Sequence, residues 1–193
     1  GFFKSIFSSG FIMNSVIGCV LSVSFGQLGL LAAPLWLGYG KETPFEAEQV
    51  LVKTSNASIS WNQIDARIQS QSLPVSSQND THYFMLTVPK HVPFTQILVR
   101  MAQHSQQDAI SIVEISGHKK NIHMEAVIRG EDTEGALASI MDIPSTKIVF
   151  QYEYPTLKEV HVGLVTAIPD LLNTVNTLGS MEGVSVLQIY DFL

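Results

Sequence analysis

The sequence predicts an α+β protein in which a membrane-embedded segment precedes a water-soluble part built on an antiparallel sheet. No Asp, Glu, Lys or Arg lies between Lys4 and Lys41, and all 17 acidic residues follow that run. From residue 82 onward, segments with a two-residue apolar period alternate with segments of helical period. Their order is strand, helix, strand, strand, helix, strand, which is typical of a sheet with both helices on one face.

The charge-free run covers residues 5–40 and is longer than the roughly 20 apolar residues that cross a bilayer as a helix. We therefore interpret residues 1–40 as a membrane-embedded helical segment. Trp36 and Tyr39 would lie at the membrane interface, where amphipathic rings collect. Three glycines would let another membrane helix approach closely: Gly18, Gly26 and Gly29.

Two other interpretations of the run stay open. A cleaved signal peptide has a basic start and an apolar stretch, and here it would end after Ala33. A lipoprotein would carry its lipid on Cys19, which follows the lipobox-like residues Val16-Ile17-Gly18. Cys19 is the single cysteine of the chain, so the later residues form no disulfide.

The bulk composition of residues 41–193 argues against a nucleic-acid partner. The chain has a net charge of −6, and the only adjacent basic pair after Lys41 is Lys119-Lys120. Binding to nucleic-acid phosphates needs a clustered basic face. The length of this part fits one or two small domains and is sufficient for a core without disulfides.

Residues 41–81 predict a linker region with a short helix. Phe45 to Lys53 could begin a helix or a strand. Trp61, Ile64 and Ile68 have helical spacing. The segment from 69 to 81 is rich in Ser, Gln, Asn and Asp, so we expect a loop there.

The next segments predict a ferredoxin-like domain over residues 82–155. Strands are expected at 82–88, 108–116, 121–129 and 147–154, with the second of them central in the sheet and a hairpin turn at 117–120. One helix follows Pro93 and carries the apolar face Phe94, Ile97, Leu98 and Met101. The other opens at Glu131, Asp132 and Glu134 and buries Ala136, Leu137, Ile140 and Met141.

The strand at 121–129 has a clear alternation of apolar and polar residues. Four side chains on one face are expected in the core: Ile122, Met124, Ala126 and Ile128. His123 and Glu125 lie on the other face, which we expect to meet solvent or a partner. On this interpretation Glu125→Lys is nearly neutral for folding.

Residues 156–193 predict a further β-α-β unit. Strands are expected at 160–167 and 184–190, and Pro169 begins a helix that Gly179 ends. The apolar stripe of this helix is Ile168, Leu171, Leu172, Val175 and Leu178. The unit either extends the first sheet through a right-handed crossover or forms half of a second domain.

The polar residues show no pattern that is typical of an active site. The six His have no metal-ligand spacing and no cysteine companion. Glu114 and Glu125 could be neighbours on adjacent strands, but a catalytic pair there is a remote alternative. The sequence has no phosphate-binding loop and no nucleophile motif. We therefore predict no catalytic, cofactor or metal residue, and a protein that is not an enzyme.

The segment 93–142 resembles the soluble domain of type IV pilus inner-membrane assembly proteins of the PilN and PilO kind, and of their type II secretion counterparts. The residues that fit are Pro93, Ile97, Met101, Ile112, Ile115, Gly130 and Leu137. The resemblance implies one transmembrane helix, a ferredoxin-like domain and an assembly role through protein–protein contacts, with another copy or a paralogous domain as partner. It implies a bacterial inner membrane, with the soluble part in the periplasm and the cytoplasmic side as an alternative.

The segment 162–190 is similar to ACT-like regulatory domains, and this is the alternative interpretation. In that family an effector binds near a strand-to-helix turn, which implies an effector site here at Val162, Gly163, Thr166 and Pro169. The chain would then be a ligand-sensing part of a membrane transporter or sensor.

The charge-free run leads to a direct test. After carbonate extraction of membranes, the chain should stay in the membrane pellet, because residues 1–40 anchor it. Release of a chain with an intact N-terminus into the supernatant would contradict the membrane interpretation.

Overall fold

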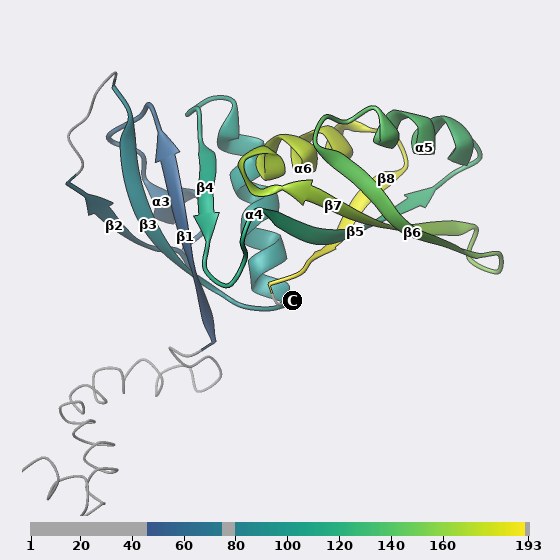
Figure 1. Cartoon of the computed structure of the whole chain (residues 1–193), viewed down its shortest axis with the longest axis horizontal. Helices are drawn as coiled ribbons and strands as arrows, with labels where there is room; N and C mark the ends of the chain where they lie inside the picture. The colour runs from purple at the N-terminus through teal and green to yellow at the C-terminus, as the bar shows by residue number, and fades with distance from the viewer. Residues whose placement is uncertain (1–45, 75–79, 192–193) are drawn as a thin grey trace, which may run out of the picture. The chain divides into compact units, whose positions relative to one another are not determined.

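The computed structural model describes residues 46–74 and 80–191 (Figure 1). The predicted membrane segment at 1–40, with Cys19 and the glycines Gly18, Gly26 and Gly29, lies outside these residues. Within the described ranges, no helix combines the length and apolar character that crossing a membrane requires. The chain from Glu48 to Leu193 forms one compact unit.

The described part is an α+β structure with two antiparallel four-stranded sheets. The first sheet has the strand order β2-β3-β1-β4. Its strands are β1 (Ala47–Thr54), β2 (Gln69–Leu73), β3 (His82–Pro89) and β4 (Ser111–Ile115), and its helices are α3 (Trp61–Ile64) and α4 (Val92–Ser105).

The second sheet has the strand order β6-β7-β5-β8. Its strands are β5 (Asn121–Arg129), β6 (Thr146–Tyr154), β7 (Glu159–Ala167) and β8 (Val184–Ile189). Helix α5 (Thr133–Met141) connects β5 to β6, and the 3-10 turn η3 (Ile168–Asp170) leads into α6 (Leu171–Ser180). Figure 1 shows α5 and α6 on the same side of this sheet.

The two halves of the described chain repeat one topology. Each half runs strand, helix, strand, strand, helix, strand, and each sheet places its second, third, first and fourth strands side by side in that order. This arrangement is compatible with a ferredoxin-like fold. The chain therefore passes through the same pattern twice, first over 47–115 and then over 121–189.

The predicted grouping of residues 82–155 in one sheet is wrong, because β3 and β4 lie in the first sheet and β5 and β6 in the second. Alternating periods identify strands and helices but do not say which strands pair. The last two strands of one repeat and the first two of the next can thus be mistaken for a single repeat. Residues 156–193 supply the second half of the second sheet rather than an addition to the first.

The same frame error explains the failed predictions around β4. This strand is an edge strand rather than a central one, and it pairs with β1. The predicted hairpin at 117–120 does not form, because β5 pairs with β7 and β8 instead. Glu114 lies opposite Leu51 and Glu125 lies opposite Gly163, so the two carboxylates are not cross-strand neighbours.

The linker prediction for residues 41–81 also needs correction. Residues 47–54 form β1, and β2 lies inside the predicted loop. The sequence Gln-Ser-Gln-Ser of β2 resembles a loop because this edge strand is exposed along nearly its whole length. The short helix is confirmed as α3, but it ends at Ile64, and Ile68 is buried beyond it.

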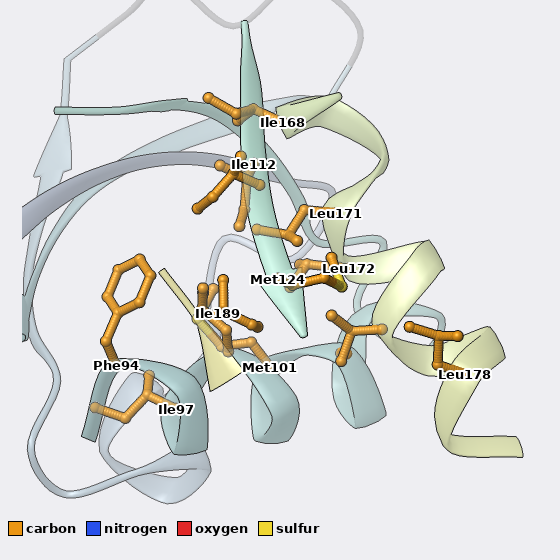
Figure 2. Packing of buried hydrophobic residues seen from close by; sticks show 14 of the residues in the cluster. Phe94, Ile97, Met101, Ile112, Met124, Ile168, Leu171, Leu172, Leu178 and Ile189 are labelled. Carbon is orange, nitrogen blue, oxygen red and sulfur yellow. The ribbon is translucent and has the colours of Figure 1, made fainter. Parts of the chain in front are cut away.

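One apolar core joins the two halves (Figure 2). Helix α4 contributes Phe94, Ile97 and Met101, and it packs against α6, which contributes Leu171, Leu172 and Leu178. The Oγ1 atom of Thr95 on α4 accepts the backbone N–H of Ile189 on β8 at 2.8 Å. These contacts bind the halves into a single body.

The predicted core faces are largely confirmed. The side chains of Ile122, Met124, Ala126 and Ile128 are at most 2% exposed, and the predicted stripe of α6 is buried throughout. Two details differ. Met141 is 65% exposed at the end of α5, and Gly179 lies inside α6.

Asp65 provides a test of the first half. Its buried carboxylate contacts Arg67 at 2.8 Å and Arg100 of α4 at 2.6 Å. The hydrogen bond from Arg67 outweighs the effect of burial and lowers the pKa of Asp65 to about 2. Asp65→Asn should therefore lower the free energy of unfolding by about 2 kcal/mol at neutral pH.

The pH dependence of this effect has a defined sign. A depressed pKa stabilises the fold fully above the ordinary value of 3.8, and the stabilisation is lost as the pH falls toward about 2. Urea unfolding at several pH values should show that the difference in unfolding free energy between wild type and Asp65→Asn decreases over that range. Asp142→Asn, at an exposed position after α5, is the control and should change stability little. A constant gap between pH 7 and pH 2 would contradict this account.

Candidate functional site

Glu125 is buried on the face of the second sheet opposite α5 and α6, which we call the helix-free face. The sequence predicts that this carboxylate faces solvent or a partner, and the solvent alternative is wrong, because only 9% of the residue is exposed. His123, two residues earlier on β5, is exposed as predicted. The difference arises because β5 is an inner strand, so neighbours on both sides cover the middle of it.

Three donors surround the Glu125 carboxylate. Its Oε1 atom accepts the hydroxyl of Tyr152 on β6 at 3.0 Å and lies 2.7 Å from Nδ1 of His161 on β7. Its Oε2 atom accepts the hydroxyl of Tyr190, just beyond β8, at 2.9 Å. An ionised carboxylate only accepts hydrogen bonds, so the short contact assigns a proton to Nδ1 of His161. The group thus links β5, β6 and β7 with the residue that directly follows β8.

The network continues along the same face toward the end of β5. The Nε2 atom of His161 lies 3.5 Å from Oε2 of Glu159, and Glu159 forms an ion pair with Arg129. Arg129 also donates to Ser185 on β8 at 3.2 Å. Each charged group in this row has a partner of opposite charge or a hydroxyl partner, so its hydrogen-bonding groups are used within the sheet.

The titration behaviour of the network favours a fixed arrangement over proton transfer. Burial raises the pKa of Glu125, but the hydrogen bonds from His161, Tyr190 and Tyr152 together lower it below the ordinary value. Desolvation and the Glu125 carboxylate raise the pKa of Tyr152 to about 12, and they raise that of Tyr190 as well. A general acid or base works best with a pKa near the operating pH. At neutral pH these three groups stay in one ionisation state.

Aromatic side chains cover the network. Phe150, Tyr152 and Tyr154 alternate along β6 and are 39–45% exposed. The Phe150 and Tyr152 rings stack at 5.8 Å, and Tyr152 stacks on His161 at 5.1 Å. Tyr154 meets His161 edge to face at 4.9 Å. We call these four residues the aromatic surface.

Gly163 makes room for the aromatic surface. A Cβ atom at this position of β7 would lie 2.1 Å from the Phe150 ring, closer than two such atoms approach. The ring therefore lies directly on the backbone of β7, and a larger residue than glycine would displace it. No side chain of residue 163 stands between Phe150 and the sheet.

β6 is also the outer strand of its sheet. It pairs with β7 on one side, and the strand order places no strand of the described chain on its other side. Edge strands present backbone N–H and C=O groups that can pair with another chain. The exposed aromatic side chains and this free edge belong to the same strand.

The effector residues predicted from the ACT-like resemblance do not converge on one face. Val162 is fully buried in the core, whereas Gly163 lies under Phe150 on the opposite face. The hydroxyl of Thr166 is buried between those of Thr146 and Thr174, at 3.0 and 3.2 Å. Pro169 lies in η3. The effector role of these residues stays a prediction.

The sequence analysis missed His161 and Tyr190 as partners of Glu125. The three residues meet only because β7 and β8 flank β5, which the period of the sequence does not reveal. The alternation of Phe150, Tyr152 and Tyr154 was the available signal, since three aromatic residues on one face of a strand are uncommon on a solvated surface. Over the described ranges, no group of three or more His, Cys, Asp and Glu is placed to hold a metal ion.

A separate groove lies where the two halves meet. It has a volume of about 480 Å³ and runs between α4 and β8. Its lining is mixed, with Arg100 and three glutamines beside apolar side chains: Val92, Thr95, Gln96, Val99, Arg100, Gln103, Val186, Leu187 and Gln188. Arg100 is already paired with Asp65, so the groove offers a ligand chiefly amide and apolar contacts.

Comparison of the chain with protein-family models, with curated proteins and with solved structures gives no match.

The buried carboxylate gives a testable consequence. Glu125→Gln should lower the free energy of unfolding by about 1–3 kcal/mol, because an amide cannot accept from three donors as a carboxylate does. Glu125→Lys should cost more, since it places a cation among those donors, and this replaces the earlier expectation of a neutral change. The pKa of Tyr152 should fall below about 12 in the Gln variant, as followed by phenolate absorbance.

Glu114→Gln is the matched control, because Glu114 is an exposed strand carboxylate of the first sheet. It should change stability by less than about 0.5 kcal/mol. The lowered pKa of Glu125 stabilises the fold above the ordinary value of 4.5, and this contribution disappears as the pH falls. Equal unfolding free energies for both Gln variants would show that the network adds nothing to stability.

Proposed function

We propose that this chain is a non-catalytic assembly protein that a membrane segment anchors and that binds another protein domain through the second sheet. The observation that carries the proposal is the aromatic surface on a free edge strand. Aromatic residues dominate the binding energy of many protein interfaces. Here they stand exposed beside unpaired backbone groups of the same strand.

The network beneath the aromatic surface prepares it for binding. Tyr152 is held by its hydrogen bond to Glu125 and by stacking on His161, and Phe150 rests on Gly163. Side chains that are already ordered lose little conformational entropy when a partner covers them. A rigid aromatic surface therefore binds more tightly than a mobile one of equal area.

The same observations argue against catalysis at this site. Glu125 and His161 satisfy each other, and the two phenols donate to the same carboxylate. A catalytic group needs a free position beside it for the reacting atom. In this network the donors of Tyr152, His161 and Tyr190 are instead paired with the carboxylate of Glu125.

The finer assignments are part of this proposal. We interpret each half as a ferredoxin-like unit and keep the resemblance to pilus and secretion assembly proteins as support for an assembly role. Residues 1–40 would anchor the chain in a bacterial inner membrane, with the described part in the periplasm. Confinement near the membrane raises the effective concentration of partners, so an interface of modest size is sufficient.

A ligand-sensing role is the second candidate, and the groove between α4 and β8 favours it. A ligand there would contact both halves and stabilise their junction. A thermal shift with an amino acid or nucleotide, lost on Gln103→Ala in the groove and unchanged by aromatic-surface variants, would favour sensing over assembly.

The assembly proposal can be tested by photo-crosslinking of the full chain in membranes. A benzophenone amino acid in place of Tyr154 should give discrete protein adducts, because this position lies on the aromatic surface. The same amino acid in place of Met141 is the control, since Met141 is 65% exposed at the end of α5.

Two results would reject the assembly proposal. One is the absence of adducts from position 154. The other is an identical set of adducts from positions 154 and 141, which would show chance collisions rather than a defined interface. The mass of the adduct also separates a second copy of the chain from a different protein.

A further inference from the structure

We propose that the partner of the aromatic surface is a second copy of this chain, joined by antiparallel pairing of β6 with β6 and centred on Tyr152. This inference rests on the proposed function and specifies its partner. The joined sheets would form one sheet of eight strands. Three observations on β6 lead to this pairing: where the strand is regular, how its side chains alternate and where its charges lie. A fourth is how the other sheet edges differ from it.

Only the second part of β6 is suited to pairing. Its register with β7 shifts between Ile148 and Phe150, so Val149 forms a bulge. Bulges and outward lysines protect edge strands against pairing, and Lys147 stands just before the bulge. From Phe150 to Tyr154 the register is regular. The protective features are thus confined to the first part of the strand.

The faces of the side chains restrict the possible registers. Residues 150, 152 and 154 lie opposite Gly163, His161 and Glu159 of β7, on the helix-free face. Residues 151 and 153 lie on the other face. A twofold axis perpendicular to the sheet keeps equivalent faces on the same side, and facing residues in an antiparallel pair share a face. The axis must therefore pass through a residue rather than between two, and only axes at residues 151, 152 and 153 pair more than the axis residue itself within the regular segment.

Charge and length decide among these three registers. An axis at residue 153 would place two Glu153 carboxylates directly opposite each other, and like charges in that position destabilise a sheet. It would also place Pro155, which has no N–H, opposite Gln151. An axis at residue 151 brings the bulge residue Val149 opposite Glu153. An axis at Tyr152 pairs the whole regular segment from Phe150 to Tyr154.

The chemistry of the Tyr152 register is complementary. The two Tyr152 rings face each other, and Phe150 of each copy faces Tyr154 of the other. Cross-strand aromatic pairs are among the favourable contacts in sheets. On the opposite face, the Gln151 amide of each copy can donate to the Glu153 carboxylate of the other. The aromatic surfaces of both copies would then form one continuous surface.

The other sheet edges of the described chain do not offer this combination. β2 is short and carries Gln-Ser-Gln-Ser, without an aromatic residue. β4 contacts η3, and β8 contacts α4, so these two edges meet the other half of the same chain. The self-complementary edge is β6.

Residues 41–193 are suitable for the test. The apolar core of the described residues lies between Val50 and Ile189, within the compact unit Glu48–Leu193, so this part contains that whole core. It also lacks Cys19, the only cysteine of the chain. Engineered cysteines therefore report only on the positions where they are placed.

Charge variants test the register through sedimentation equilibrium. Gln151→Glu should weaken dimerisation about five- to tenfold, because it creates two carboxylate pairs per dimer. Gln151→Lys should strengthen it, and the double variant Gln151→Glu with Glu153→Lys should restore it. Gln71→Glu on the exposed edge strand β2 is the matched control and should leave the dimerisation constant unchanged.

Cysteine pairs test the same register without disturbing the Glu125 network. Gln151→Cys and Glu153→Cys should each remain largely unlinked alone, and an equimolar mixture should form a disulfide-linked dimer on mild oxidation. Facing Cα atoms in antiparallel pairs lie about 4.5–5.5 Å apart, within the range of a disulfide.

The outcomes separate this inference from the proposed function. A dimer whose constant does not respond to Gln151→Glu, or a mixture that does not link, overturns pairing through β6. A protein that stays monomeric in sedimentation, with photo-adducts from position 154 that have another protein's mass, overturns the second copy as partner and leaves the assembly proposal standing. The absence of dimers together with the absence of adducts overturns both the β6 pairing and the assembly proposal.

Discussion

The packing of α4 against α6 is the contact on which the rest of the structure depends. Each helix covers one face of its own sheet, and the two helices then cover each other. Phe94, Met101 and Leu178 belong to one continuous core (Figure 2). Burial of this apolar area stabilises both halves together. A half with a single four-stranded sheet would leave the outer side of its second helix exposed to water.

This contact also decides which strand edges stay free. β4 meets η3 and β8 meets α4, so the inner edge of each sheet is used within the chain. The outer edges, β2 and β6, remain. They differ in chemistry: β2 carries Gln-Ser-Gln-Ser before Leu73, whereas β6 carries three exposed aromatic residues. A repeated topology has thus produced one edge that avoids association and one that favours it.

In the Glu125 network, a carboxylate on an inner strand is buried and holds the side chains around it in place. Because β5 lies between β7 and β8, the Glu125 carboxylate on its helix-free face is covered by Tyr152, His161 and Tyr190. Such a buried carboxylate is tolerated only when donors surround it. The carboxylate in turn holds the donors in place, and two of them, Tyr152 and His161, belong to the aromatic surface. Stability and the shape of the proposed interface therefore depend on the same residues.

The sequence alone determined the local structure of the later part of the chain: the strand at β5, the apolar faces of α4 and α6, and the burial of Met124 and Leu171. Those features follow from periods of two and 3.6 residues, which side-chain direction imposes on each element. Only the tertiary structure decided that β4 and β5 belong to different sheets, that Ser- and Gln-rich β2 is a strand, and that His161 meets Glu125. Each of these depends on which strands pair across long separations, and a local period carries no information about that choice.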